Sequence, residues 1–175
     1  MRARQWMLLV VMVASLGTQG CRYSVDDSQS LTLEQRTTIE DSVRRFSVAV
    51  AQDVTQQGPV AWRKHFAGSP AFFMAVNGKL VFPSGQAAAA AIPDIAYQFK
   101  RIELRWGDDL RLDALTKNLC MVATSYTEVV ELRPGIQGIH GTQSGYFTGL
   151  AENHNGQWQF RDAHWSAPML PAKVP

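Results

Sequence analysis

The chain has 175 residues, a formal net charge of +2 at pH 7, and 46% hydrophobic and 18% charged residues. This composition excludes an intrinsically disordered chain, a collagen-like fibre and a disulfide-rich miniprotein. A dedicated nucleic-acid-binding protein needs a large basic excess, so we expect no nucleic-acid partner.

Residues 1–20 are typical of a secretory signal peptide. Arg2 and Arg4 give a positive start, and nine apolar residues follow without interruption from Trp6 to Ala14. This run is too short to span a bilayer, which takes about 20 apolar residues. We therefore expect export. Removing Arg2 and Arg4 would lower the 17 basic residues to 15, equal to the 15 acidic ones.

Cys21 follows Gly20 and precedes the polar stretch RYSVDDSQS. This junction resembles the lipobox of bacterial lipoproteins, in which the cysteine becomes the lipidated N-terminus, although Thr18 and Gln19 depart from the motif's preferred residues. The resemblance implies a periplasmic lipoprotein that contacts the membrane only through this anchor, with residues 21–30 as a polar tether. The alternative is an ordinary cleaved signal, which leaves Cys21 incidental and the protein secreted in soluble form.

A single domain is expected over residues 31–170, and residues 31–55 predict its first helix. Thr32 and Gln35 match a capping box. Five apolar residues recur on one helical face: Ile39, Val43, Phe46, Val50 and Val54. Gly58-Pro59 should end this helix, and a short second helix is expected at residues 60–66.

The Asn77-Gly78 pair lies between two β-prone segments and predicts a hairpin of residues 71–76 and 79–82. Ser84 can cap a third helix that passes through five consecutive alanines. Pro93 should kink or end that helix, because proline lacks the N–H donor and clashes with the preceding turn.

The rest of the chain predicts strands. Alternating or long β-prone runs occupy residues 101–112, 119–132, 139–151 and 157–166. Helices followed by long antiparallel strands are typical of an α+β domain with its helices on one face of a curved sheet.

This order of elements resembles that of the nuclear transport factor 2-like (NTF2-like) superfamily and its SnoaL-like members. Two passages carry the likeness: QQGPVAWRKHFAGSPAFFMAVNGKLVF, with an Asn-Gly turn, and GQWQFRDAHWS, a last strand with Gly-x-Trp and a late His and Ser. The resemblance covers about residues 33–168 and implies a cone, in which three helices pack on a curved antiparallel sheet around a largely apolar cavity. It also implies dimers through the outer sheet face. Isomerases, dehydratases, hydrolases, cyclases and proteins without known activity share this fold, so it leaves function open.

The sharpest catalytic candidates lie on the last strand. Period-two alternation places Asp162 and His164 on one face with Trp158 and Phe160, where the carboxylate can orient the imidazole as a general base. The alternative is a structural role, in which His164 hydrogen-bonds a neighbouring strand and Asp162 is solvated or paired with an arginine.

Thr124, Tyr126 and Glu128 share one face of the strand at residues 119–132. Tyr126 is either a donor to a ligand carbonyl or a core tyrosine with a satisfied hydroxyl group. Glu128 lies near the strand's end and is expected to be solvated. Cys120 on this strand is expected to be a buried, inert thiol.

Several aromatic side chains are expected either to line the cavity or to fill the core: Trp62, Phe66, Phe73, Trp106 and Trp158. Arg101, Glu103 and Arg105 share one strand face and predict a solvated ladder, a dimer surface or a contact to an anionic ligand. No metal or cofactor is expected, because the four His residues lack ligand spacing and no phosphate-binding glycine loop occurs.

Three functions are compatible with these features, and no motif decides whether the protein is an enzyme. The first, which we favour, is a cell-envelope binding or accessory protein with a pocket for a small apolar ligand. The second is a small isomerase, cyclase or hydrolase with His164 as the base and Asp162 or Tyr126 assisting. The third is an interaction module that forms a homodimer or docks through its sheet face.

Overall fold

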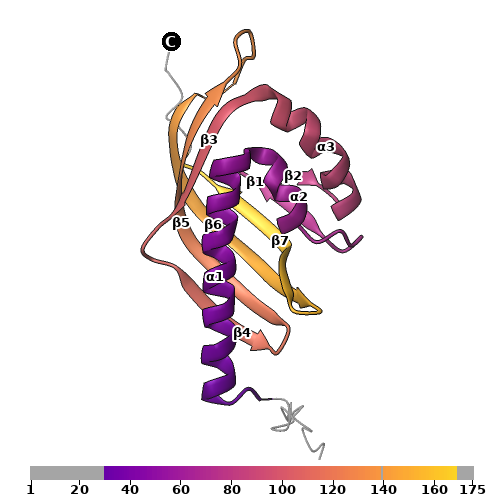
Figure 1. Cartoon of the computed structure of the whole chain (residues 1–175), viewed down its shortest axis with the longest axis vertical. Helices are drawn as coiled ribbons and strands as arrows, with labels where there is room; N and C mark the ends of the chain where they lie inside the picture. Colours follow the sequence, from indigo (N-terminus) through magenta and orange to yellow (C-terminus); the bar gives the residue numbers. More distant parts are fainter. Residues whose placement is uncertain (1–29, 139, 169–175) are drawn as a thin grey trace, which may run out of the picture.

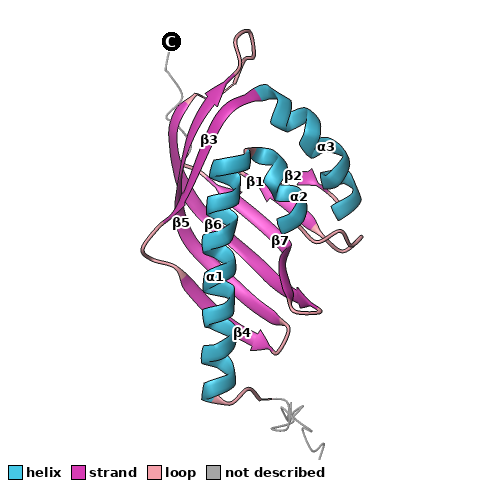
Figure 2. Cartoon of the chain, viewed as in Figure 1, coloured by secondary structure: helices cyan, strands magenta, loops and turns pink. Residues whose placement is uncertain are grey.

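The computed structural model describes residues 30–138 and 140–168, so the expected signal peptide and Cys21 lie outside the described residues. In the described part, three α-helices and a short 3-10 helix lie against a curved sheet of seven strands (Figure 1 and Figure 2). None of these helices combines the length and the apolar character that crossing a membrane requires.

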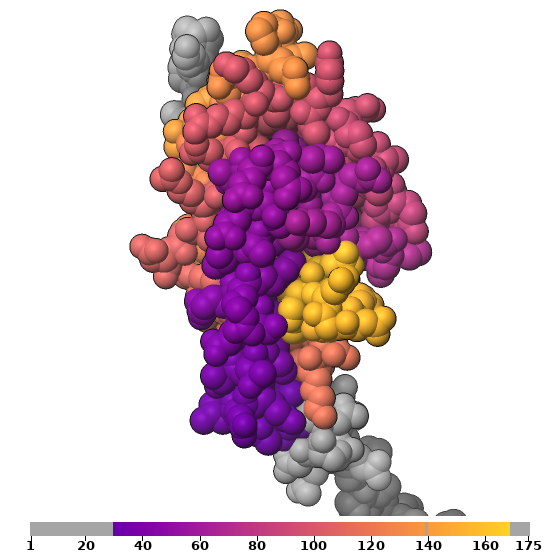
Figure 3. Space-filling view, in the orientation of Figure 1, coloured from indigo at the N-terminus to yellow at the C-terminus, as the bar shows by residue number. Residues whose placement is uncertain are grey.

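Helix α1, Leu33–Gln57, begins at the predicted capping box. The Thr32 hydroxyl accepts a hydrogen bond from the Gln35 N–H at 3.2 Å, and the Gln35 side chain accepts one from the Thr32 N–H at 2.9 Å. The predicted apolar face is confirmed, because it contains the buried residues Val43, Val50 and Val54. Figure 3 shows α1 running along one face of the molecule.

The chain turns after α1 through a 3-10 helix, Pro59–Ala61, into the short helix α2, Trp62–His65. Strands β1, Phe73–Val76, and β2, Lys79–Phe82, then form the predicted hairpin. Both turn residues adopt positive φ angles, 49° at Asn77 and 78° at Gly78, as a tight hairpin turn requires.

Helix α3, Gly85–Gln98, is capped by Ser84, whose hydroxyl accepts a hydrogen bond from the Ala87 N–H at 3.2 Å. The helix continues through Pro93, so the proline does not end it. Because proline has no N–H, the Ala89 carbonyl lacks its usual intrahelical donor at that point.

Residues 101–112 form parts of two strands, and the expectation of one continuous strand is wrong. Strand β3, Phe99–Trp106, and strand β4, Arg111–Thr116, are separated by a turn. Asp109 fixes this turn, because its carboxylate accepts hydrogen bonds at 2.8 Å from both the N–H and the hydroxyl group of Ser125.

The remaining strands are β5, Leu119–Leu132, β6, Gly141–His154, and β7, Gln157–Ser166. The sheet order is β2-β1-β7-β6-β5-β3, and β4 also pairs with β5. The α+β class is confirmed, but the sheet is mixed, because β1 pairs parallel with β7. These two strands come from distant parts of the chain, so no tight turn forces them to be antiparallel.

Candidate functional site

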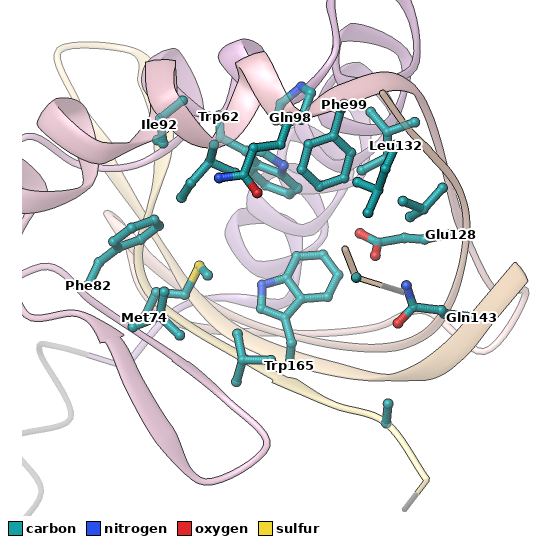
Figure 4. A pocket seen from close by; sticks show the side chains of 18 of the residues that line it. Trp62, Met74, Phe82, Ile92, Gln98, Phe99, Glu128, Leu132, Gln143 and Trp165 are labelled. Carbon is teal, nitrogen blue, oxygen red and sulfur yellow. The ribbon is translucent and has the colours of Figure 1, made fainter. Parts of the chain in front are cut away.

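A cavity of about 420 Å³ opens between α3, the α2 region and the concave face of the sheet (Figure 4). Most of its wall is apolar, with contributions from the helices, the β1–β2 hairpin and the long strands. Its main apolar residues are Trp62, Phe66, Phe82, Ile92, Phe99 and Trp165. A concave, mostly apolar site with a few polar groups is the usual form of a small-molecule pocket.

A glycine on β6 makes room for one wall of this cavity. Gly145 lies opposite Tyr126 in the β5–β6 register. A Cβ atom at Gly145 would lie 2.0 Å from the Ser166 carbonyl oxygen on β7 and 2.8 Å from the Tyr126 hydroxyl oxygen, closer than such atoms pack. The Tyr126 ring instead packs edge-on against Trp165, with ring centroids 4.8 Å apart.

Glu128 is the acidic residue among the described residues that line the cavity, and the expectation that it is solvated is wrong. It lies half-buried on β5 and lines the cavity, and Figure 4 shows its carboxyl group pointing inward beside Gln143. Burial raises the pKa of this carboxyl group from 4.5 to about 7. The strand does not end near Glu128, because β5 continues to Leu132 and pairs with β3 as far as Phe99.

Tyr126 and Thr124 are buried on the same side of β5 as Glu128, as their alternation predicts. Tyr126 lines the cavity and packs against the core at the same time. Burial raises the pKa of its phenol, and the nearby Glu128 raises it further. The hydroxyl group is therefore held in its neutral form at ordinary pH.

The five expected pocket aromatics divide into two groups. Trp62 and Phe66 line the cavity. Phe73 does not, and it is 42% exposed. Trp106 and Trp158 also lie outside the lining because both indoles are tied to α1: Trp106 donates to the Ser47 carbonyl at 2.7 Å and Trp158 to the Ser42 hydroxyl at 2.9 Å.

A β-bulge reverses the faces of β7, so the face predicted for its second half is wrong. In the β6–β7 register, Ala151 pairs with Phe160 and Leu150 pairs with Asp162, which leaves Arg161 as an extra residue. An extra residue shifts all later side chains to the opposite face. Trp165 therefore lines the cavity, and its neighbour His164 is exposed.

Asp162 and His164 remain on a common face beyond the bulge, outside the cavity lining. The Asp162 carboxylate lies 3.5 Å from the Arg161 guanidinium. Burial raises the pKa of Asp162, while Arg161 opposes that effect and Glu152 adds to it. The arginine pairing agrees with the structural alternative for Asp162, and a catalytic role for Asp162 and His164 stays a prediction.

Sequence reasoning missed a polar cluster between α1 and α2. His65 is buried, and its Nε2 atom lies 2.9 Å from the Asp53 carboxylate, which Lys64 also contacts at 2.6 Å. Burial lowers the pKa of His65 although Asp53 opposes that shift, and the Lys64 hydrogen bond lowers the pKa of Asp53. No spacing motif marks these residues, because the turn between the helices brings them together.

The charged ladder of β3 lies on the face opposite the buried residues Ile102 and Leu104. Glu103 pairs with both Arg101 and Arg105, so the ladder neutralises much of its own charge. Within residues 30–138 and 140–168, no group of His, Cys, Asp or Glu side chains is arranged to hold a metal ion.

No protein family model matches the chain, and no curated protein matches its sequence. Solved structures do match its fold. A scytalone dehydratase-like protein from Novosphingobium aromaticivorans has a TM-score of 0.66 at 11% identity, covering 82% of this chain and 94% of its own. An NTF2-like protein of unknown function from Pseudomonas putida has a TM-score of 0.60 at 17% identity, covering 78% and 91%.

The hexachlorocyclohexane dehydrochlorinase LinA-type3 from Novosphingobium barchaimii has a TM-score of 0.58 at 13% identity, covering 82% of this chain and 99% of its own. Structural matches at sequence identities this low establish the fold of this chain and leave its activity open. The curved sheet, the helices on one side and these matches agree with the expected architecture. The chain has the NTF2-like, SnoaL-like cone fold.

Proposed function

We propose that this domain binds a small, largely apolar molecule in its cone. The observation that carries the proposal is the cavity of about 420 Å³, whose wall is apolar except for a few polar side chains. Pockets of this size and composition accommodate small organic ligands. The polar groups near Glu128 would orient the ligand, and the aromatic rings would supply most of the contact area.

Native mass spectrometry of the protein purified from its own cells tests this proposal, followed by extraction of any bound molecule. We expect a bound species that is lost in Ile95→Trp, because a bulky indole at this lining position on α3 fills the cavity. Leu115→Trp is the matched control, since Leu115 is half exposed on β4 and does not line the cavity. Equal retention of the species in both variants would place its binding elsewhere.

We further propose that the domain works in the cell envelope, held to a membrane by lipid on Cys21. The positive start, short apolar run and Gly20-Cys21 junction of the sequence support this. Palmitate labelling of cells should mark the wild-type protein and not Cys21→Ser. An unlabelled protein released from the cells would support the alternative of a secreted, soluble form.

A second candidate function is acid–base catalysis in the same cavity. The specific observation is Glu128, because a carboxyl group with a pKa of about 7 can give or take protons at neutral pH. Two matching structures are described as dehydratase-like and as a dehydrochlorinase. This candidate assigns the proton transfer to Glu128 in place of the predicted His164 and Asp162.

The base-promoted ring opening of 5-nitrobenzisoxazole offers a general assay for such a carboxylate. We expect a rate that rises with pH as Glu128 ionises and that disappears in Glu128→Gln. His164→Ala and Asp162→Asn test the original candidates. Because neither residue lines the cavity, we expect both variants to keep the wild-type rate in this assay. A rate that survives Glu128→Gln would remove Glu128 from the reaction.

A further inference from the structure

Within the part of the chain that the structure describes, the carboxyl group of Glu128 has no hydrogen-bonding or ionic partner. Burial is the cause acting on its pKa. Its neighbours across the sheet are Leu104 on β3 and Gln143 on β6, and neither carries a charge. A half-buried acid without a protein partner leaves its charge to be met by water or by a bound molecule.

The charged groups around this part of the sheet do not line the cavity. Tyr126 is the other titratable residue of the described lining, and its phenol is neutral. The charged groups of the surrounding strands and their ends lie outside the lining: Lys79 on β2, Lys100, Arg101, Glu103 and Arg105 on β3, Arg111 and Asp113 on β4, Glu131 on β5 with Arg133 after it, Glu152 and His154 on β6 with His140 before it, and Arg161, Asp162 and His164 on β7. Asp94 on α3 is also outside it. Among the described residues that line the cavity, Glu128 is therefore the acidic side chain, and none is basic.

The cavity also presents aromatic rings to the space in front of this acid. Trp62, Phe99 and Trp165 all project into it, as Figure 4 shows. Ring faces attract cations, and the attraction grows when water is excluded. An ammonium group would thus find a carboxylate and aromatic surface in one place, whereas an anionic ligand would meet only the acid.

We propose that the cavity selects ligands that carry one protonated amine on an apolar body, with Glu128 accepting the hydrogen bond of the ammonium group. This inference rests on the proposed small-molecule function and names the chemical class of the ligand. The amide side chains of Gln98 and Gln143 also line the cavity and can satisfy a second polar group of the ligand.

The proposal predicts how the affinity for an amine changes with pH, because binding of an ammonium group is linked to the ionisation of Glu128. An alkylamine keeps its proton well above pH 8, since a lysine-like amine has a pKa of about 10.4. A bound ammonium favours ionised Glu128, so binding would release the proton that the free protein holds below pH 7. Affinity for the amine should therefore rise with pH and level off above pH 8. A ligand that accepts a hydrogen bond from neutral Glu128 favours the protonated acid, so its affinity would fall as pH rises.

The test uses three probes that share one apolar body: 4-phenylbutylamine, 4-phenylbutan-1-ol and 4-phenylbutanoate. Calorimetry on the purified protein at pH 6 and pH 8 should show the amine binding at least about tenfold more tightly than the alcohol at pH 8. The amine's affinity should rise about tenfold from pH 6 to pH 8, as the ionised fraction of Glu128 grows. The carboxylate probe should bind most weakly.

Glu128→Gln keeps the shape of the side chain and removes its charge. In this variant the amine should bind no better than the alcohol, and the pH trend should vanish, while alcohol binding persists. Glu131→Gln is the matched control, because Glu131 is exposed on the same strand and pairs with Lys100 outside the cavity. It should leave all three affinities unchanged.

Two results would overturn the amine assignment alone. One is equal binding of the amine and the alcohol to wild-type protein at pH 8, and the other is an amine preference that survives Glu128→Gln. In both cases alcohol binding would still support the small-molecule function. Failure of all three probes to bind at millimolar concentration would count against the amine assignment and the pocket function together.

Discussion

The half-buried carboxyl group of Glu128 ties the stability of the domain to pH. Its pKa rises from 4.5 to about 7 on folding. Between these values the folded protein holds a proton that the unfolded chain has released, so stability falls as pH rises through this window and is constant above it. Glu128→Gln removes the titration. Relative to wild type, this variant should therefore gain up to about 3 kcal/mol of unfolding free energy between pH 5 and pH 8.

Urea denaturation of both proteins at pH 5 and pH 8 measures this difference. Glu131→Gln again serves as the control, because its exposed carboxyl pairs with Lys100, which lowers its pKa instead of raising it. The same stability difference between wild type and Glu128→Gln at both pH values would show that Glu128 titrates normally in the folded state.

The thiol of Cys120 should be inert in the folded protein. Cys120 is fully buried, and burial raises its pKa to about 11, so very little reactive thiolate forms at pH 8. In a Cys21→Ser background, we expect a disulfide reagent to react with Cys120 only after denaturant is added. Fast labelling of the native protein would reveal an opening of the sheet near β5.

Side-chain alternation could be counted correctly only where strands are regular. On β5 it correctly placed Thr124, Tyr126 and Glu128 on one face. On β7 the same counting failed beyond Arg161, because one unpaired residue inverts every later position. No local residue pattern marks this bulge, so Trp165 could not be recognised as a cavity residue, although its aromatic character made it a candidate for burial.

Among the elements, the start of α3 depends on a close approach of backbones. A Cβ atom at Gly85 would lie 2.2 Å from the Ala67 carbonyl oxygen, and backbone cannot swing aside. Gly85→Ala should therefore destabilise the domain by about 1–3 kcal/mol. Gly68→Ala is a matched control, because a Cβ there would meet nothing within 4 Å. Equal unfolding free energies in thermal or urea denaturation would contradict the tight packing of this helix start.

The joint between α1 and α2 depends on the Asp53 carboxylate. Asp53→Ala leaves buried His65 without this partner, at a cost of about 1–3 kcal/mol. Because Asp53 raises the pKa of His65 against the effect of burial, its loss should lower that pKa further, which NMR titration can follow. Asp41→Ala, at an exposed position on the same helix, should change neither quantity.

Helix and hairpin positions were predictable because their signals are local. The Thr32–Gln35 capping box and the Asn77-Gly78 turn act within a few residues, and the structure confirms both. The parallel pairing of β1 with β7 and the Asp53–His65 contact join distant segments, for which the sequence carries no local mark. The resemblance to a known fold predicted the cone, whereas the position of Glu128 inside the cavity could be recognised only from the structure.

At the scale of the whole molecule, the two faces of the sheet have different characters. The concave face lines the cavity, while the central strands of the opposite face carry short polar side chains and one tyrosine. Charged residues flank them: Asp109 accepts a hydrogen bond from Ser125, Arg105 pairs with Thr127 in the sheet, and His164 pairs with Thr148. We call these central residues the polar face: Ser125 and Thr127 on β5, and Ser144, Tyr146 and Thr148 on β6. Tyrosine is enriched at protein interfaces, and Tyr146 is exposed at the centre of this face, so we propose that a second copy of this chain covers it.

Because the cavity and the proposed dimer contact lie on opposite faces of the sheet, a substitution on one face should abolish one property and leave the other intact. Tyr146 is 38% exposed at the centre of the polar face, and Tyr146→Glu would bring two like charges together across a symmetric contact. Sedimentation velocity should show a dimer for wild type and a monomer for Tyr146→Glu, with unchanged probe affinity in the cavity. Leu115→Glu, a charge added on exposed β4, should leave the dimer intact. A wild-type monomer at micromolar concentration would refute the dimer, whereas a joint loss of dimer and ligand would show that the two faces are coupled through β5 and β6.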